Sequence, residues 1–249
     1  MIEENRGHGK AMPLLSHLSE LRWRLIASLL TILVFFAISL FFSSSIINFL
    51  KEPLLACLPE TPQNLHFTGP LDVFLTSIKS SFLAALVLAC PVWIYHFWRF
   101  IEPALYDNEK KYIFPFIFVS ILLFLFGISF SYFFILPISL EFLIKLGLEV
   151  STPMITIKDY FSLLSIMIFG FGFIFEAPLI LVLLSFLGFV DHRQLSSVRR
   201  YVCVACFIVA AIFTPPDPLS QVGMAIPLYI MYEISIMIIK LINKKAQNT

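Results

Sequence analysis

The stretch YFSLLSIMIFGFGFIFEAPLILVLLSFLGFV, which runs from Tyr160 to Val190, decides the fold class of this protein. Glu176, near its middle, is its only charged residue. About 20 apolar residues, each adding about 1.5 Å of helix, cross the hydrocarbon core of a bilayer, so the stretch is long enough to span a membrane. A carboxylate at that depth costs at least about 2.5–3.5 kcal/mol and usually faces a bundle interior or a wet cavity. We therefore expect an intramembrane polar groove at Glu176.

The rest of the chain has the composition of a multi-pass membrane protein. Of its 249 residues, 59% are hydrophobic and 13% are charged, against about 25% charged in soluble domains. The net charge of +1 provides no basic field that would favour nucleic acid. The sequence has no HExxH, GxSxG or GxxxxGK[ST] motif, and its four cysteines lack partners at zinc spacing. We expect neither catalysis, nor a cofactor, nor a metal site.

Six apolar stretches predict an all-α membrane protein with six transmembrane helices, at residues 25–42, 73–98, 112–136, 160–187, 201–213 and 218–239. They form one transmembrane domain, residues 25–240. Residues 1–24 are expected to be an amphipathic segment at the membrane interface, and residues 241–249 a short tail. Prolines at 53, 59, 62 and 70 predict that residues 43–72 are a broken loop with at most short helices, and residues 138–159 are expected to be a second polar loop.

Lysine and arginine are distributed asymmetrically between the two sides of this arrangement. The segments 1–24, 99–111, 188–200 and 240–249 hold 13 of the 17 basic residues. The positive-inside rule therefore places these segments, and both termini, in the cytoplasm. The fifth stretch has only 13 residues, about 20 Å of helix against a hydrocarbon core of about 30 Å. The fifth and sixth helices are expected to form a short hairpin that stops short of the outer face or thins the bilayer.

Acidic residues also lie on the basic side, where topology alone does not require them. Glu20 precedes the first span, and the loop RFIEPALYDNEKK (residues 99–111) carries Glu102 and Glu109 beside an apolar ledge of Phe100, Pro103 and Leu105. Carboxylates beside a stiff apolar surface suit a cationic peptide, because they pair bidentately with guanidinium groups. The residues alone favour a simpler alternative, in which Glu109 pairs with Lys110 or Arg99 or caps a helix.

Three polar residues flank the sixth span. Asp217 is expected to cap its first turn, with a polar docking spot as the alternative. Gln221 lies one turn further on, and Glu233 lies near the inner end of the same span.

Four motifs, in this order on a six-span frame, resemble the TatC family, the large membrane subunit of the twin-arginine protein translocase. They are HLSELRWR (17–24), FIEPALYDNEKK (100–111), FGFGFIFEAP (169–178) and TPPDPLSQVGMAIPLYIMYE (214–233), and the resemblance runs from about Leu14 to Leu241. It implies a cupped, concave bundle in the bacterial inner membrane. It also implies a receptor for folded precursor proteins whose signal peptides carry two adjacent arginines, with transport driven by the proton-motive force.

The resemblance also implies roles for individual residues. Glu20 and Glu109 would bind the arginine pair, Arg22 matches a basic residue of the first motif, and Glu176 lies inside the concave bundle. Single-span partners of the TatA and TatB type would contact the last two helices near Asp217, Gln221 and Glu233, and further partners would be other copies of the chain and the lipid bilayer. Glu102 is an additional acidic residue that departs from the family pattern. The resemblance therefore does not decide which of the carboxylates bind the arginines.

A second functional class competes with this interpretation. A proton-coupled secondary transporter of a small solute could use Glu176 as its protonatable group. Such transporters usually contain inverted repeats, and no internal repeat is visible in this sequence.

Overall fold

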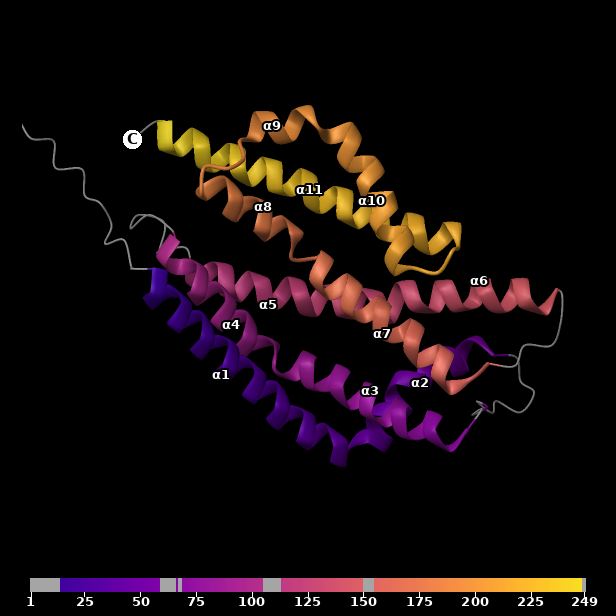
Figure 1. The fold of residues 1–249 in the computed structure, drawn as a ribbon. Helices are drawn as coiled ribbons and strands as arrows, with labels where there is room; N and C mark the ends of the chain where they lie inside the picture. Colours follow the sequence, from indigo (N-terminus) through magenta and orange to yellow (C-terminus); the bar gives the residue numbers. More distant parts are fainter. Residues whose placement is uncertain (1–13, 59–65, 67–68, 105–112, 150–154, 248–249) are drawn as a thin grey trace, which may run out of the picture.

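The computed structural model describes residues 14–58, 66, 69–104, 113–149 and 155–247, and these residues are almost entirely helical (Figure 1). The helices are α1 (Leu14–Phe41), α2 (Ser43–Cys57), α3 (Pro70–Leu88), α4 (Cys90–Ile101), α5 (Ile113–Phe130), α6 (Leu136–Leu148), α7 (Ile157–Ile174), α8 (Ala177–Phe186), α9 (His192–Ser197), α10 (Arg199–Phe213) and α11 (Pro218–Gln247). A 3₁₀ turn, η1 (Glu102–Ala104), follows α4, and a π-helical segment, η3 (Ser131–Ile135), joins α5 to α6. The prediction of an all-α membrane protein is confirmed.

The helices run between two ends of an elongated bundle. At one end, which we call the rim, α1 begins, α4 ends, α5 begins, α8 passes into α9, and α11 ends (Figure 1). At the opposite end lie α2, the end of α6 and the start of α7. The turn between α10 and α11 lies well short of the end of α6. The segments that the charge distribution assigns to one side of the membrane therefore gather at the rim, where the structure describes them.

Five helical runs of the described chain are long and apolar enough to cross a membrane. They are Ser19–Phe41, Pro70–Leu88, Ile113–Leu148, Ile157–Phe186 and Pro218–Ile242. The predicted fifth span is the 15-residue helix α10, which provides only about 22 Å of helix. The sixth helix extends beyond the predicted boundary at residue 239, because α11 continues to Gln247.

The prediction of a broken loop over residues 43–72 is wrong in its first half, where α2 continues for 15 residues through Pro53. A proline has no N–H to bond the carbonyl one turn earlier, here that of Phe49. The Tyr132 hydroxyl donates to this Phe49 carbonyl at 2.6 Å, and the Tyr160 hydroxyl donates to the neighbouring Leu50 carbonyl at 2.5 Å. The Tyr132 hydroxyl therefore replaces the missing helical bond, Tyr160 adds a second contact beside it, and α2 persists.

The prediction of a loop over residues 138–159 is also wrong in its first half, because α6 extends to Leu148 past Pro137. The π-helical segment η3 precedes this proline, and within it the Leu136 N–H donates to the Ser131 carbonyl, five residues back. A π segment widens the backbone by one residue per turn, which lets the proline ring fit without ending the helix. Residues 113–148 therefore form one helical run of 36 residues.

The second and fourth predicted spans are each broken by a proline. Pro91 separates α3 from α4 at Ala89, and the Trp93 indole N–H donates to the Leu86 carbonyl at 3.2 Å, beside the break. Pro178 separates α7 from α8, so that Glu176 lies at the break. Breaks of this kind follow from the N–H that proline lacks and from the steric effect of its ring.

A close helix contact in the core lies between α5 and α7. Phe124, Phe171 and Phe175 are fully buried there. Gly127 lies so near α7 that a Cβ added to it would be 2.7 Å from the backbone oxygen of Phe171. A Cβ added to Gly172 would likewise be 2.8 Å from the Phe124 ring. Small residues at these positions let the two helix backbones approach, as is typical of membrane helices.

The substitution Gly127→Ala is expected to lower the stability of the purified protein by about 1–3 kcal/mol, because the new methyl group meets a backbone atom that cannot rotate away. Thermal unfolding in detergent measures the effect. Gly147→Ala on α6 is the matched control, since an added Cβ there meets nothing within 4 Å. Equal melting temperatures for the two variants would contradict the assignment of Gly127 to a backbone contact.

Candidate functional site

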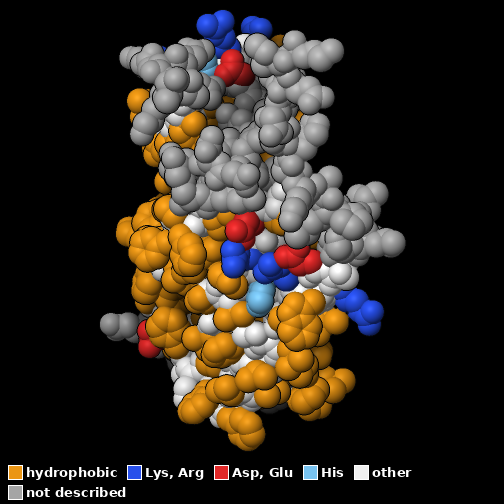
Figure 2. Space-filling model, turned by 90° about the vertical axis from the view of Figure 1, so that its left-hand side faces the viewer, with side chains coloured by type: hydrophobic (Ala, Val, Ile, Leu, Met, Phe, Trp, Pro, Cys, Tyr) orange, Lys and Arg blue, Asp and Glu red, His pale blue; other side chains and the backbone are white. Residues whose placement is uncertain are grey.

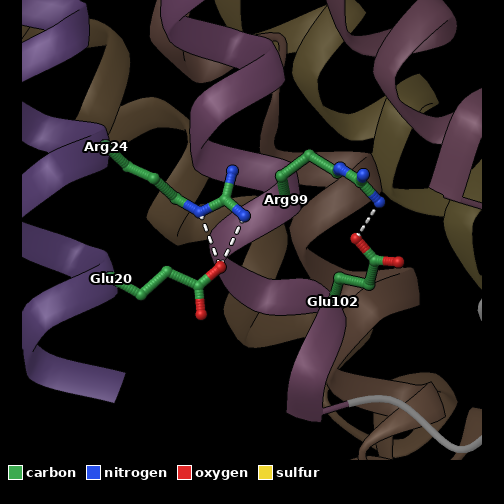
Figure 3. A network of polar contacts seen from close by, with 4 residues as sticks. All are labelled: Glu20, Arg24, Arg99 and Glu102. Atoms are coloured by element: carbon green, nitrogen blue, oxygen red, sulfur yellow. Dashed lines mark hydrogen bonds and ion pairs between the residues drawn. The ribbon is translucent and has the colours of Figure 1, made fainter. Parts of the chain in front are cut away.

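The rim end of α1 carries an ion pair between Glu20 and Arg24, one helical turn apart. The Nε and Nη2 atoms of Arg24 both donate to Oε1 of Glu20, at 2.9 and 2.5 Å (Figure 3). The Glu20 side chain is only 25% exposed and the Arg24 side chain only 19%. The residues at this spacing face one another on a helix surface, so the pair forms within α1 itself.

A second ion pair lies at the end of α4. Arg99 donates through Nη1 to Oε2 of Glu102, the first residue of η1 (Figure 3). The Arg99 guanidinium also lies 5.9 Å from the centroid of the Tyr95 ring, within the range of a cation–π contact. Pro103 follows Glu102 and turns the chain from the α-helix into the 3₁₀ turn. The side chain of Glu102 thereby stays against the last turn of α4.

The two pairs belong to one polar cluster, because α1 packs against α4. Figure 2 views the rim end directly and shows acidic and basic side chains grouped in the middle of it, with hydrophobic side chains below them. Two carboxylates and two guanidiniums leave this cluster, Glu20, Arg24, Arg99 and Glu102, without net charge. We call it the rim cluster.

The predicted recognition residues lie in and around the rim cluster only in part. Glu20 is a member, Arg22 is exposed beside it on α1, and Pro103 is exposed at η1. Phe100 is half-buried. Leu105 and Glu109 lie outside the described residues. Their predicted roles stay predictions.

Arg24 and Arg99 are the members that sequence reasoning missed as partners of the carboxylates. The sequence offered Arg99 as a partner of Glu109, whereas the structure pairs Arg99 with Glu102. The signal was present in the sequence, because Glu20–Arg24 and Arg99–Glu102 have the spacings of four and three residues that favour ion pairs on helices.

Glu176 lies at the break between α7 and α8. Its Oε2 accepts a hydrogen bond from the Ser120 hydroxyl of α5 at 2.6 Å, and its Oε1 is buried with no hydrogen-bond partner among the described residues. A groove of about 550 Å³ lies between α1, α2, α3, α5, η3 and α7, but its lining is mostly apolar and does not include Glu176. The polar groove expected at Glu176 therefore stays a prediction.

Asp217 and Gln221, at the start of the last helix, both form hydrogen bonds within the protein. Asp217 is 1% exposed, and its Oδ2 accepts from the backbone N–H of Ser220 at 2.7 Å while its Oδ1 accepts from the Ser220 hydroxyl. The prediction that Asp217 caps the last helix is confirmed. The Gln221 amide donates to the Phe207 carbonyl of α10 at 3.2 Å.

Glu233 forms a bidentate pair with Arg199 at the start of α10. Its Oε1 and Oε2 accept from Nε and Nη2 of Arg199 at 2.8 and 2.9 Å. Together with the Gln221 contact, this pair ties α10 to α11 at two points along their length. Among the described residues, no group of three or more His, Cys, Asp or Glu side chains is placed to hold a metal ion.

The fold and the site define a multi-pass helical membrane protein that carries a cluster of ion pairs at the rim end of its bundle. Comparisons with known proteins identify the family. Residues 16–227 match the model of the family "Sec-independent protein translocase protein (TatC)". The chain belongs to the TatC family.

Relatives and solved structures agree with this assignment. The chain is 42% identical to the Sec-independent protein translocase protein TatC of Aquifex aeolicus, over 95% of this chain and 98% of the relative. It is 36% identical to the TatC of Escherichia coli K12, over 95% and 91%. A crystal structure described as the twin arginine translocase receptor TatC superposes with a TM-score of 0.77 at 40% identity, covering 90% of this chain and 98% of that one. The predicted resemblance is confirmed, and the protein is a component of a protein translocase.

The substitution Asp217→Ala is expected to destabilise the protein by about 0.5–2 kcal/mol, since it leaves the first turn of α11 without its cap. Thermal unfolding of the purified protein measures the loss. Asp217→Asn is the control, because an amide oxygen can still accept from the Ser220 N–H. A melting temperature lowered equally by both changes would show that the carboxylate acts other than as a cap.

Proposed function

We propose that this chain is the signal-peptide receptor of a twin-arginine translocase and binds the arginine pair of folded precursor proteins at its rim. The observation that carries the proposal is the rim cluster itself, in which half-buried carboxylates already hold guanidinium groups. A carboxylate that binds the guanidinium of Arg24 has the geometry and the surroundings to bind the guanidinium of an arginine in a signal peptide. Glu20 and Glu109 are proposed to provide the two carboxylates that an arginine pair requires.

The strength of such contacts fits the selection of two arginines. Charge-assisted hydrogen bonds contribute about 1.5–3 kcal/mol each. Losing one such contact therefore weakens binding by about tenfold or more. Phe100 and Pro103, which flank Glu102 in the sequence, are proposed to provide apolar surface for the residues that follow the arginines.

The topology proposed with this function places the rim and both termini in the cytoplasm of a bacterial cell, with the bundle in the inner membrane. The support is the charge distribution, since most lysines and arginines belong to the segments that meet at the rim. The named relatives are bacterial proteins. A precursor would meet the rim cluster before any other part of the chain.

Single-span partners of the TatA and TatB type are proposed to bind along α10 and α11, and further copies of the chain to join the complex. The support is that α10 has an exposed apolar face at helical spacing, formed by Val204, Ile208 and Ile212. This helix is also short for a bilayer. Asp217, Gln221 and Glu233 are proposed to shape this contact by fixing the hairpin. Transport is proposed to draw on the proton-motive force.

Export of a twin-arginine precursor is expected to be abolished by Glu20→Ala and by Glu109→Ala, because each change removes one of the carboxylates that bind the arginines. The export assay is run in cells without another copy of this protein, and immunoblotting measures the amount of each variant in the membrane. Glu141→Ala is the control, since Glu141 is exposed on α6 and pairs only with Lys145 among the described residues. Normal export by the two rim variants, or loss of the protein itself, would contradict the site.

Glu176→Gln is expected to keep most of the export activity, whereas Glu176→Leu is expected to lose it. The reason is that Glu176 acts as a hydrogen-bonding group toward Ser120, which an amide can replace and a hydrocarbon cannot. The same export assay compares the two variants at matched protein amounts. Loss of export in Glu176→Gln would instead require the carboxylic acid itself, as a proton-coupled role does.

A further inference from the structure

The ion pair between Glu20 and Arg24 uses only half of the carboxylate. Both donors of Arg24 converge on Oε1 of Glu20, and Oε2 takes no part in the pair (Figure 3). Glu20 thus has one oxygen held by the chain's own guanidinium and one oxygen left over from that contact. The pair lies on the rim surface that the proposed function assigns to the arginines of the signal peptide.

We propose that Arg24 is a resident competitor, an arginine of the receptor that occupies the arginine site on Glu20 until a signal peptide displaces it. The inference rests on the proposed function of Glu20 and goes beyond it, because it assigns Arg24 a role in setting how tightly any cation binds there. The chain carries its own copy of the ligand's recognition group, one helical turn from the carboxylate that reads it.

Displacement is chemically an exchange of one guanidinium for another. The incoming arginine first meets Oε2, which Arg24 does not use, and then takes both oxygens in the bidentate geometry that a planar fork and a carboxylate prefer. The Arg24 side chain turns into solvent on its flexible stem. Glu20 therefore never stands uncompensated in its half-buried position, where an unpaired charge is costly.

The resident arginine has a defined effect on selection. Every cationic ligand must break the same pair, so Arg24 weakens the binding of arginine and lysine peptides by one common factor. The ratio of their affinities is unchanged. The dissociation constants of the weaker ligands, however, rise above the concentrations at which these ligands are present, so they no longer occupy the site. Arg24 thus sets the affinity threshold of the receptor, while the geometry of the carboxylates sets its preference for guanidinium.

The neighbouring pair supports this function of Arg24. Arg99 already neutralises Glu102, so the rim cluster as a whole has no net charge. A rim with two open carboxylates would attract any basic segment near the membrane surface by long-range electrostatics. With both carboxylates occupied, attraction requires close contact and exchange.

The test measures peptide binding to the full chain in lipid nanodiscs. The probes are a fluorescent peptide with two adjacent arginines before an apolar segment and the same peptide with two lysines. For Arg24→Gln we expect both peptides to bind about two- to fivefold more tightly, the range that breaking an exposed to half-buried ion pair covers, with the ratio of their affinities unchanged. Arg193→Gln, which removes an exposed rim charge at the start of α9, is the matched control and is expected to change binding far less.

Arg24→Lys separates displacement from a plain charge effect. Lysine keeps the positive charge but lacks the two convergent donors of Arg24, so the variant is expected to bind both peptides more tightly than the wild type. This variant also serves if Arg24→Gln does not fold. Unchanged or weaker binding in Arg24→Lys, or weaker binding in Arg24→Gln, would overturn the proposal and show that Arg24 positions Glu20 or acts only through its charge.

The wild-type measurement tells the two proposals apart. If the wild-type chain shows no preference for the two-arginine peptide over the two-lysine peptide, the proposed receptor function itself fails, and the role of Arg24 fails with it. If the preference is present but the Arg24 variants do not bind more tightly, only the resident-competitor proposal fails.

Discussion

The structure depends on one constraint, which is that a backbone carbonyl in hydrocarbon must find a donor within the protein. Several prolines remove such donors from the long helices, and the structure compensates for each proline in a different way. Tyr132 donates to the carbonyl that Pro53 leaves free, Trp93 donates beside the break at Pro91, and a π segment absorbs Pro137. These solutions decide where the helices bend and where they continue, and hence the shape of the bundle on which the rim is built.

Charged side chains are subject to a similar constraint, and most of those described near the membrane have partners within the protein. At the rim, Glu20 and Glu102 are each held by an arginine of the same segment, and on the last hairpin Glu233 pairs with Arg199 across two helices. Asp217 is buried, with both oxygens accepting hydrogen bonds from Ser220. Glu176 is the exception, since its Oε2 accepts from Ser120 while its Oε1 is buried with no hydrogen-bond partner among the described residues. A site for cationic peptides on this framework is one in which guanidinium groups exchange rather than fill empty positions.

Much of the fold was predictable because membrane insertion is governed by the length and polarity of each segment. The apolar stretches, the short fifth helix, the asymmetry of basic residues and the cap at Asp217 all follow from properties that a segment has by itself. The Glu20–Arg24 pair was predictable in the same way, since it needs only the spacing of one helical turn. The pair between Arg99 and Glu102 was not predicted, because the competing carboxylates of one loop cannot be ranked without its backbone.

What the sequence by itself determined is therefore the class of protein, the approximate positions of the five long apolar spans, the side of the membrane on which its charges are expected and the family to which it belongs. The tertiary structure alone decided that α2 is a helix through Pro53, because the carbonyl that this proline leaves free accepts from Tyr132, which lies 83 residues away. It also decided that Ser120 faces Glu176 across two helices. Contacts between segments far apart in the chain arise from packing, which no local pattern of residues encodes.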